Sequence, residues 1–198
     1  MAEVVPLLEE AIAANPGVSL STAALLLSFC GTDRHRSAAS LLSDAANDGF
    51  ASVPEDVWWL STLTMYAAAA VVLRSPVPAA ALLDLLKPWH DLVAFGKVTL
   101  EGPVSHYLGG LAGILSRPEE SEAYFAEAAA ASECLGARFF SARTDLEAAN
   151  MLASRPTTTS TDRQEAQRLA TCALATASSA GYLALERRAR MLLKQLDL

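Results

Sequence analysis

The sequence predicts an all-α protein, built as a right-handed α-solenoid of about ten antiparallel helices. About a fifth of the 198 residues are alanine, and apolar residues make up 52% of the chain, whereas charged residues make up only 19%. Glycine and proline residues divide the chain into helix-length segments with apolar positions at helical spacing. We identify no convincing strand, and expect at most a helical turn and an irregular crossing at 89–101. A single domain over residues 1–198 follows.

The clearest helix pair covers residues 102–136. On its first helix, small residues lie where the second helix of the pair would pack. Phe125 and Ala128 lie on that second helix. This alternation of small and large residues is typical of a tetratricopeptide unit, in which one helix packs on the next. We expect Gly109 to let the two backbones approach each other and Phe125 to fill the space beside it.

Helix caps and breakers place the remaining helices. Two S-x-P-E segments, at 52–55 and 116–119, predict a reused capping pattern at helix starts. Asp33 is expected to cap the third helix, and Asp162 or Thr161 the ninth. Besides the pair in 102–136, the helices are expected at residues 4–14, 19–30, 33–47, 56–73, 78–87, 137–154, 162–180 and 183–196.

The last segment, 183–196, divides into two faces. One face is apolar, and arginine and lysine residues occupy the other side. The final helix of a solenoid must bury its apolar face on the preceding pair. We therefore expect 183–196 to be a capping helix rather than a DNA-binding one, with an apolar stripe of Leu185, Ala189, Leu192 and Leu196.

Charge, cysteine content and hydropathy limit the classes of function. A net charge of −7 and an isoelectric point near 4.9 argue against a nucleic-acid-binding surface spread over the domain. Cys30, Cys134 and Cys172 lie in apolar contexts without a C-x-x-C pair, so we expect buried, reduced thiols and a cytoplasmic protein. No signal-peptide pattern opens the sequence. The uncharged segment 57–73 is short for a membrane span, so we expect a buried helix, with a membrane helix as the alternative.

Motifs for catalysis or metal binding are not recognisable in the sequence. It contains no G-x-x-x-x-G-K-[ST] phosphate loop, no G-x-S-x-G nucleophile elbow and no H-E-x-x-H pair. We therefore expect no catalytic residue, no metal ligand and no cofactor.

Five residues are candidates for a groove or an interaction surface. His106 lies three residues before Gly109, on the face that such repeats present to peptides; the alternative is a partly exposed histidine at a helix start. Trp58 and Trp59 point about 100° apart on a helix, so one is expected in the core and the other at a groove or seam. The remaining two, Arg143 and Glu147, are four residues apart and are expected to form an intrahelical ion pair.

Three segments together resemble a known family. They read GFASVPEDVWWL at 49–60, GPVSHYLGGLA at 102–112 and LGARFFSART at 135–144. In these segments the chain is similar to the C-terminal tetratricopeptide-like region of large bacterial ATP-dependent regulators, the LuxR-type, MalT-like signal-transduction ATPases and the related cyclase-linked AAA proteins. The resemblance extends from about residue 20 to the end. This chain departs from the family at His106, where arginine is usual, and at Ser121, where alanine is usual.

The resemblance implies a scaffold role. In those regulators a nucleotide-binding domain precedes this region, and in the LuxR type a helix-turn-helix domain follows it; neither pattern occurs here. We expect a non-catalytic module that binds a protein, a peptide or a small ligand, or other domains of a larger regulator, in a bacterial transcriptional regulatory system. Direct contact with nucleic acid or membrane is not expected. The alternatives are a small all-helical enzyme and a membrane-associated protein.

Overall fold

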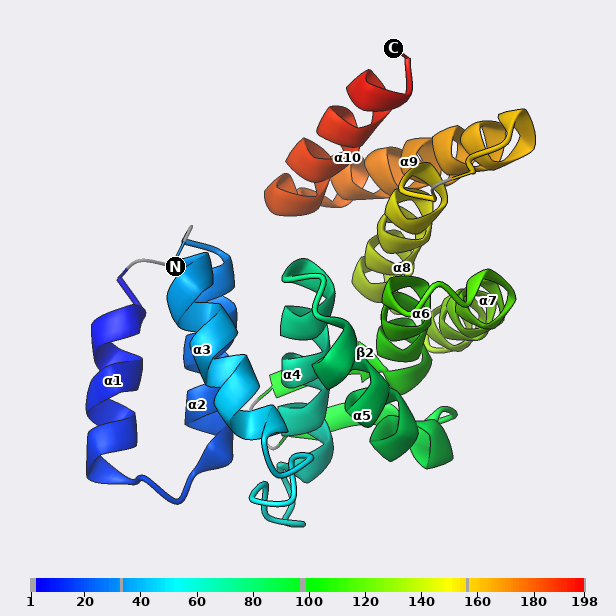
Figure 1. Ribbon diagram of the computed structural model, residues 1–198. Coiled ribbons are helices and arrows are strands. Elements are labelled where there is room, and N and C mark those ends of the chain that lie inside the picture. Colours follow the sequence, from blue (N-terminus) through cyan, green and yellow to red (C-terminus); the bar gives the residue numbers. More distant parts are fainter. Residues whose placement is uncertain (1–2, 33, 97–98, 156, 198) are drawn as a thin grey trace.

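The computed structural model describes residues 3–32, 34–96, 99–155 and 157–197. This part of the chain is mostly helical, as the sequence predicts, with ten α-helices, one short 3-10 helix and one two-stranded sheet (Figure 1). The α-helices are α1 (Val5–Ala14), α2 (Ser19–Cys30), α3 (His35–Ala46), α4 (Trp59–Val72), α5 (Pro76–Leu86), α6 (Val104–Ile114), α7 (Pro118–Cys134), α8 (Arg138–Ala153), α9 (Ser160–Ala180) and α10 (Leu183–Leu196).

A small hairpin replaces the irregular crossing expected between α5 and α6. After the 3-10 helix η1 (Lys87–Trp89), strand β1 (Val93–Gly96) pairs antiparallel with β2 (Thr99–Pro103). The expectation of no strand is therefore wrong. The strands were missed because each is only four or five residues long, too short for an alternating pattern to stand out. The hairpin packs against α4, so tertiary contacts rather than local propensity stabilise it.

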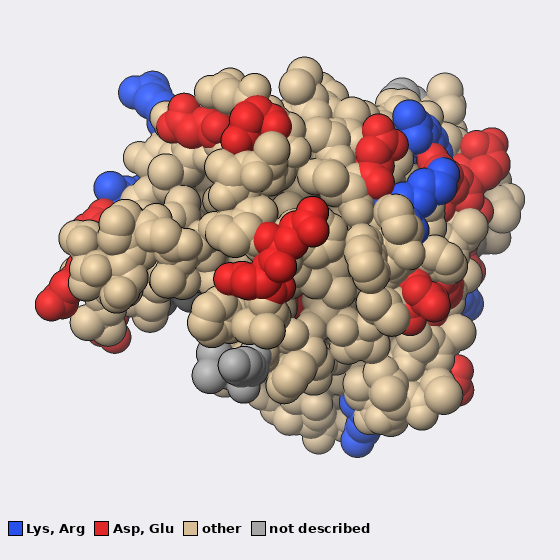
Figure 2. Space-filling view, turned by 90° about the horizontal axis from the view of Figure 1, so that it is seen from below, with Lys and Arg blue, Asp and Glu red and all other residues tan. Residues whose placement is uncertain are grey.

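The helices pack in a regular order. Each α-helix contacts the next one along the chain, and the even-numbered helices also contact one another, α2 with α4, α4 with α6, α6 with α8 and α8 with α10. In Figure 1 the helices from α1 to α7 follow one another in a row, and α8, α9 and α10 continue above its C-terminal end. On the face shown in Figure 2, charged side chains form small separate groups on a largely uncharged surface.

Helix α6 lies at the centre of this arrangement, and glycines allow its close contacts. All residues from 104 to 112 are buried. A Cβ atom built on Gly109 would lie 2.8 Å from the ring of Phe125 on α7, and one built on Gly110 would lie 2.8 Å from the Cγ2 atom of Val71 on α4. A Cβ atom on Gly113 would overlap the terminal methyl group of Met151 on α8. Each glycine therefore brings α6 close to a different neighbouring helix.

The helix pair α6 and α7 is also joined by a buried polar contact. The Ser121 hydroxyl on α7 donates a 2.7 Å hydrogen bond to the carbonyl oxygen of Gly109, which a glycine leaves accessible. Ala128, one helical turn beyond Phe125, has no exposed surface. The serine at position 121, unusual for the resembled family, thus has a structural role.

Several expected caps are absent from the structure. Ser116 adopts a left-handed conformation (φ 58°) and ends α6, and no side chain caps the start of α7. Helix α4 begins at Trp59 rather than at 56, so the segment 52–55 lies in turns. At 116–119, Pro118 is the first residue of α7 and disfavours a helical conformation at Arg117, so the helix starts past Ser116. Asp33 lies outside the described residues.

The cap of α9 also lies elsewhere than expected. Thr159, not Asp162 or Thr161, is the N-cap residue. Its hydroxyl oxygen accepts a 3.1 Å hydrogen bond from the Asp162 backbone N–H, and the Asp162 carboxylate accepts a 2.8 Å bond from the Thr159 N–H. This reciprocal capping box begins two residues before Thr161 and three before Asp162, the two caps expected from the sequence.

The expectation of three buried thiols is wrong. Cys134 and Cys172 are exposed and Cys30 is partly buried; all three are free. Alanines lie on several sides of helices such as α7 and α9, so an apolar sequence context does not identify the buried side. The uncharged segment 57–73 contains the whole of α4, most of whose residues are buried. Within the described ranges, no helix combines the length and the apolar character needed to cross a bilayer.

Candidate functional site

A groove of about 630 Å³ is lined by residues from all five even-numbered helices. We call it the five-helix groove. The side chains of α6 and α8 that line it recur every three or four residues, so each helix contributes one continuous stripe. The largest contributions come from α4 (Met65, Ala68, Val71 and Val72), α6 (His106, Tyr107, Gly110 and Ile114) and α8 (Arg143, Glu147, Asn150 and Met151).

His106 lines this groove but is almost fully buried, with 8% of its surface exposed. Its Nε2 atom accepts a 3.2 Å hydrogen bond from Nε of Arg143, so the ring proton resides on Nδ1. Nδ1 then donates to the Thr144 hydroxyl at 3.0 Å. Burial lowers the pKa of His106 well below its usual value, and the nearby positive charges of Arg143 and Arg188 lower it further. The side chain is therefore a neutral imidazole at pH 7.

Arg143 does not form the ion pair expected from the sequence. Its guanidinium lies over the ring of Tyr107, 5.1 Å from the centroid, and 5.5 Å from that of Phe140. Its donor contact is with neutral His106. Among the residues that the structure describes, no carboxylate lies within ion-pair distance of this guanidinium. Arg143 is thus a half-buried cation held in place by uncharged groups.

Glu147 pairs with another helix instead. Its carboxylate accepts a 3.0 Å hydrogen bond from Arg188 on α10, so this contact joins α8 to α10 across the groove. The groove also contains Arg74 and Glu101. Three arginines and two glutamates give the lining a formal charge of +1, in a chain whose net charge is −7. The groove is therefore a positively charged region of an acidic protein.

The two tryptophans lie outside the residues that line the groove. Trp59 packs edge-on against Trp89 of η1, with ring centroids 5.9 Å apart. Trp58 lies beside the hairpin, and its indole N–H is buried without a hydrogen-bond partner among the described residues. Trp58 therefore packs beside the hairpin and Trp59 against η1, and neither belongs to this site.

Sequence reasoning missed several groove residues, and one signal pointed to some of them. Tyr107, Gly110 and Ile114 continue the helical stripe of His106 along α6. The missed charged residues, Arg74, Glu101 and Arg188, come from parts of the chain whose contact with the groove depends on tertiary packing. Arg188 lies on α10, next to Ala189 of the apolar stripe.

The groove does not contain a recognisable catalytic arrangement. Both ring nitrogens of His106 are engaged by protein groups, so neither is free to activate a nucleophile. In the part of the chain that the structure describes, no three His, Cys, Asp or Glu side chains are grouped so that they could hold a metal ion.

Comparisons with known proteins leave the family open. A scan against protein-family models and searches of curated proteins and of solved structures gave no match to this chain.

Proposed function

We propose that this chain is a non-catalytic binding module, a right-handed α-solenoid of antiparallel helix pairs whose five-helix groove binds a peptide through a carboxylate group. The Arg143 guanidinium carries the proposal: it is half-buried, fixed by two aromatic rings and a neutral histidine, and without a carboxylate partner in the described chain. A guanidinium binds a carboxylate through two parallel hydrogen bonds, and this pairing is strong where water is partly excluded.

Two features support the solenoid arrangement. Contacts between successive even-numbered helices run through the whole chain from α2 to α10, while each odd-numbered helix after α1 contacts the helix before and after it. In an α-solenoid one helix of every pair lines the concave surface. The five-helix groove is lined by one helix of every pair, which fits that arrangement.

The biological setting is proposed from the resemblance to bacterial regulators alone. There the module would be cytoplasmic and would bind a protein partner, or another domain of a larger regulator, without contacting DNA or membrane. An all-helical enzyme is the less favoured alternative, since the groove offers an engaged, neutral histidine and no free base.

An array of random decapeptides tests the proposal. The labelled full chain is applied to the array, and the strongest ligands are resynthesised and titrated by fluorescence anisotropy. We expect ligands with an essential Asp, Glu or C-terminal carboxylate. Arg143→Gln should weaken their binding by about tenfold or more, because a charged hydrogen-bonded pair is lost. Arg143→Lys should bind with an affinity between those of the parent chain and Arg143→Gln. Arg163→Gln, the same charge change at an exposed position of α9, is the control.

Two results would overturn the proposal. One is equal binding of ligands in which every carboxylate has been replaced by an amide. The other is an Arg143→Gln variant, folded by circular dichroism, that binds as tightly as the parent chain.

A further inference from the structure

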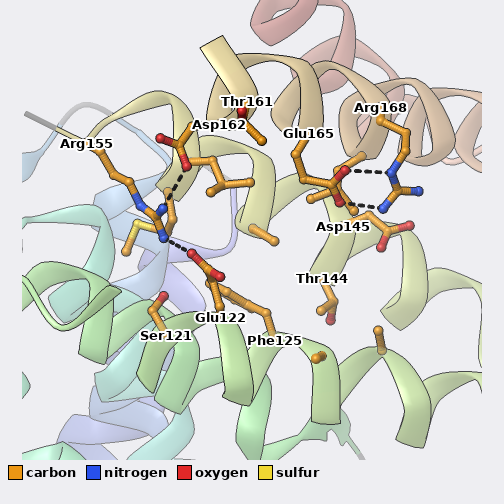
Figure 3. Close-up of a pocket in the computed structure, with 16 residues that line it drawn as sticks. Ser121, Glu122, Phe125, Thr144, Asp145, Arg155, Thr161, Asp162, Glu165 and Arg168 are labelled. Atoms are coloured by element: carbon orange, nitrogen blue, oxygen red, sulfur yellow. Dashed lines mark hydrogen bonds and ion pairs between the residues drawn. The ribbon is translucent and has the colours of Figure 1, made fainter. Parts of the chain in front are cut away.

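A second groove lies on a different face of α8, between α7 and α9 (Figure 3). We call it the α7–α9 groove. It has a volume of about 510 Å³, within the range of ligand-binding pockets. Its floor is apolar and includes three alanines, which leave room above it for a ligand. The floor consists of Phe125, Ala126 and Ala129 of α7, Ala148, Met151 and Leu152 of α8, and Leu169 of α9.

Charged side chains surround this apolar floor, and the two cations among them are already paired. Arg155 binds the carboxylates of Glu122 and Asp162, as the dashed lines in Figure 3 show. Arg168 forms two hydrogen bonds with Glu165, of 2.8 and 2.6 Å. The lining contains four carboxylates and two guanidinium groups, which gives a formal charge of −2. The groove is therefore opposite in charge to the five-helix groove.

The fourth carboxylate, Asp145 of α8, lacks such a partner. It is partly buried, and within the described chain its carboxylate takes part in no hydrogen bond and no ion pair. The nearest cation, Arg168, is turned to Glu165, and Asp145 lies beside this pair in Figure 3. Burial raises the pKa of Asp145, which reflects poor solvation of its charge. A cation supplied by a ligand would stabilise that charge.

We propose that the α7–α9 groove binds a partner peptide that places a lysine or arginine side chain over the alanine-rich floor, with its cationic group against Asp145. Both side chains have a long apolar stem and a charged end, which matches an apolar floor beside a carboxylate. The excess of negative charge favours a basic peptide over an acidic peptide or a nucleic acid. This site is distinct from the five-helix groove, although Met151 lines both, and the two grooves require ligands of opposite charge.

Selection from a library of random twelve-residue peptides displayed on phage tests the proposal. Peptides are selected on the full parent chain after depletion on the Asp145→Asn variant, so that the survivors depend on this carboxylate. We expect enrichment of lysine and arginine flanked by apolar residues. Synthetic survivors should bind the parent chain at least about tenfold more tightly than the variant, and more weakly at high salt.

Three further variants make the result specific. Ala126→Trp places a large side chain in the groove from an exposed position of α7, and it should also abolish binding without unfolding the chain. Glu133→Gln, an exposed position of α7 with the same charge change, should bind as the parent does. Arg143→Gln should also bind normally, which separates this site from the five-helix groove. The proposal is overturned if no peptide is enriched, if the enriched peptides lack basic residues, or if folded Ala126→Trp binds them unchanged.

Discussion

The Nδ1 atom of His106 on α6 lies 3.0 Å from the hydroxyl oxygen of Thr144 on α8, and both side chains are buried. His106 lines the five-helix groove, and Thr144 lines the α7–α9 groove. This hydrogen bond therefore joins the walls of the two grooves. The imidazole is neutral in this arrangement, because its other ring nitrogen accepts a hydrogen bond from Arg143.

Acidification should destabilise the protein through His106. The unfolded chain binds a proton at this histidine near pH 6.5, whereas the folded pKa is well below that value. Below about pH 6.5 the unfolded state therefore binds the additional proton, and the free energy of unfolding falls until the folded pKa is reached. One proton limits the slope to about 1.4 kcal/mol per pH unit. Urea unfolding at pH 7.5 and pH 5.0 measures the effect.

Two variants assign the effect to this residue. His106→Gln keeps a hydrogen-bonding side chain without a titrating ring, so it should lose less stability than the parent between the two pH values. His90→Gln, which removes an exposed histidine and its contact with Glu127, is the comparison variant. Equal acid sensitivity in His106→Gln and the parent would contradict the prediction.

Gly109→Ala should destabilise the protein by about 1–3 kcal/mol, measured by denaturant unfolding. Alanine gains about 1 kcal/mol of helix propensity over glycine. However, its Cβ would lie 2.8 Å from the Phe125 ring, which is itself buried and packed against His106. Overpacking should therefore dominate, and Phe125→Leu should relieve part of it in the double variant. Gly17→Ala, where a Cβ meets no atom within 4 Å, is the control; a Gly109→Ala variant as stable as this control would refute the predicted contact.

Two of the three cysteines should react quickly with a thiol reagent in the native protein. Cys134 and Cys172 are exposed, whereas Cys30 is partly buried and burial raises the pKa of its thiol. A time course with a colorimetric disulfide reagent should show two fast equivalents and one slow one that becomes fast in denaturant. Cys134→Ser and Cys172→Ser should each remove one fast equivalent. Three fast equivalents, or none, would disagree with the structure.

The apolar stripe of α10 should stabilise the C-terminal helices. Leu192 is 5% exposed, whereas its neighbour Met191 is 59% exposed. Leu192→Ala should cost about 2–5 kcal/mol in the free energy of unfolding, because a cavity forms between α10 and its neighbours. Met191→Ala should cost less than about 0.5 kcal/mol. Similar values for the two variants would mean that α10 does not pack through the predicted stripe.

The sequence predicted helices more reliably than their ends. Helical spacing and breakers located all ten α-helices, and the four stripe residues of 183–196 are buried as predicted. The caps at 52–55 and 116–119 failed because a cap depends on the path of the preceding chain, which the local motif does not determine. The predicted burial of Cys134 was wrong for a different reason, since an alanine-rich helix such as α7 has no distinct apolar face.

The candidate site was predicted only in part, for the same physical reason. Three of the five interaction candidates, His106, Arg143 and Glu147, line the five-helix groove. The ion pair predicted between Arg143 and Glu147 was wrong. Arg143 instead contacts His106, 37 positions away along the chain, and Glu147 contacts Arg188, 41 positions away. The α7–α9 groove gave no sequence signal, since its lining comes from three helices that only tertiary packing brings together.

The three glycines of α6 also have a consequence for folding. Together they lower the intrinsic stability of that helix by about 3 kcal/mol relative to alanine, so α6 has little tendency to form alone. It gains stability only when α4, α7 and α8 are present to pack against it. The buried apolar residues form one cluster that extends to α6 and another in α8–α10. Because α6 becomes ordered only when it packs on its neighbours, the two clusters depend on each other. We therefore expect them to unfold in one cooperative transition.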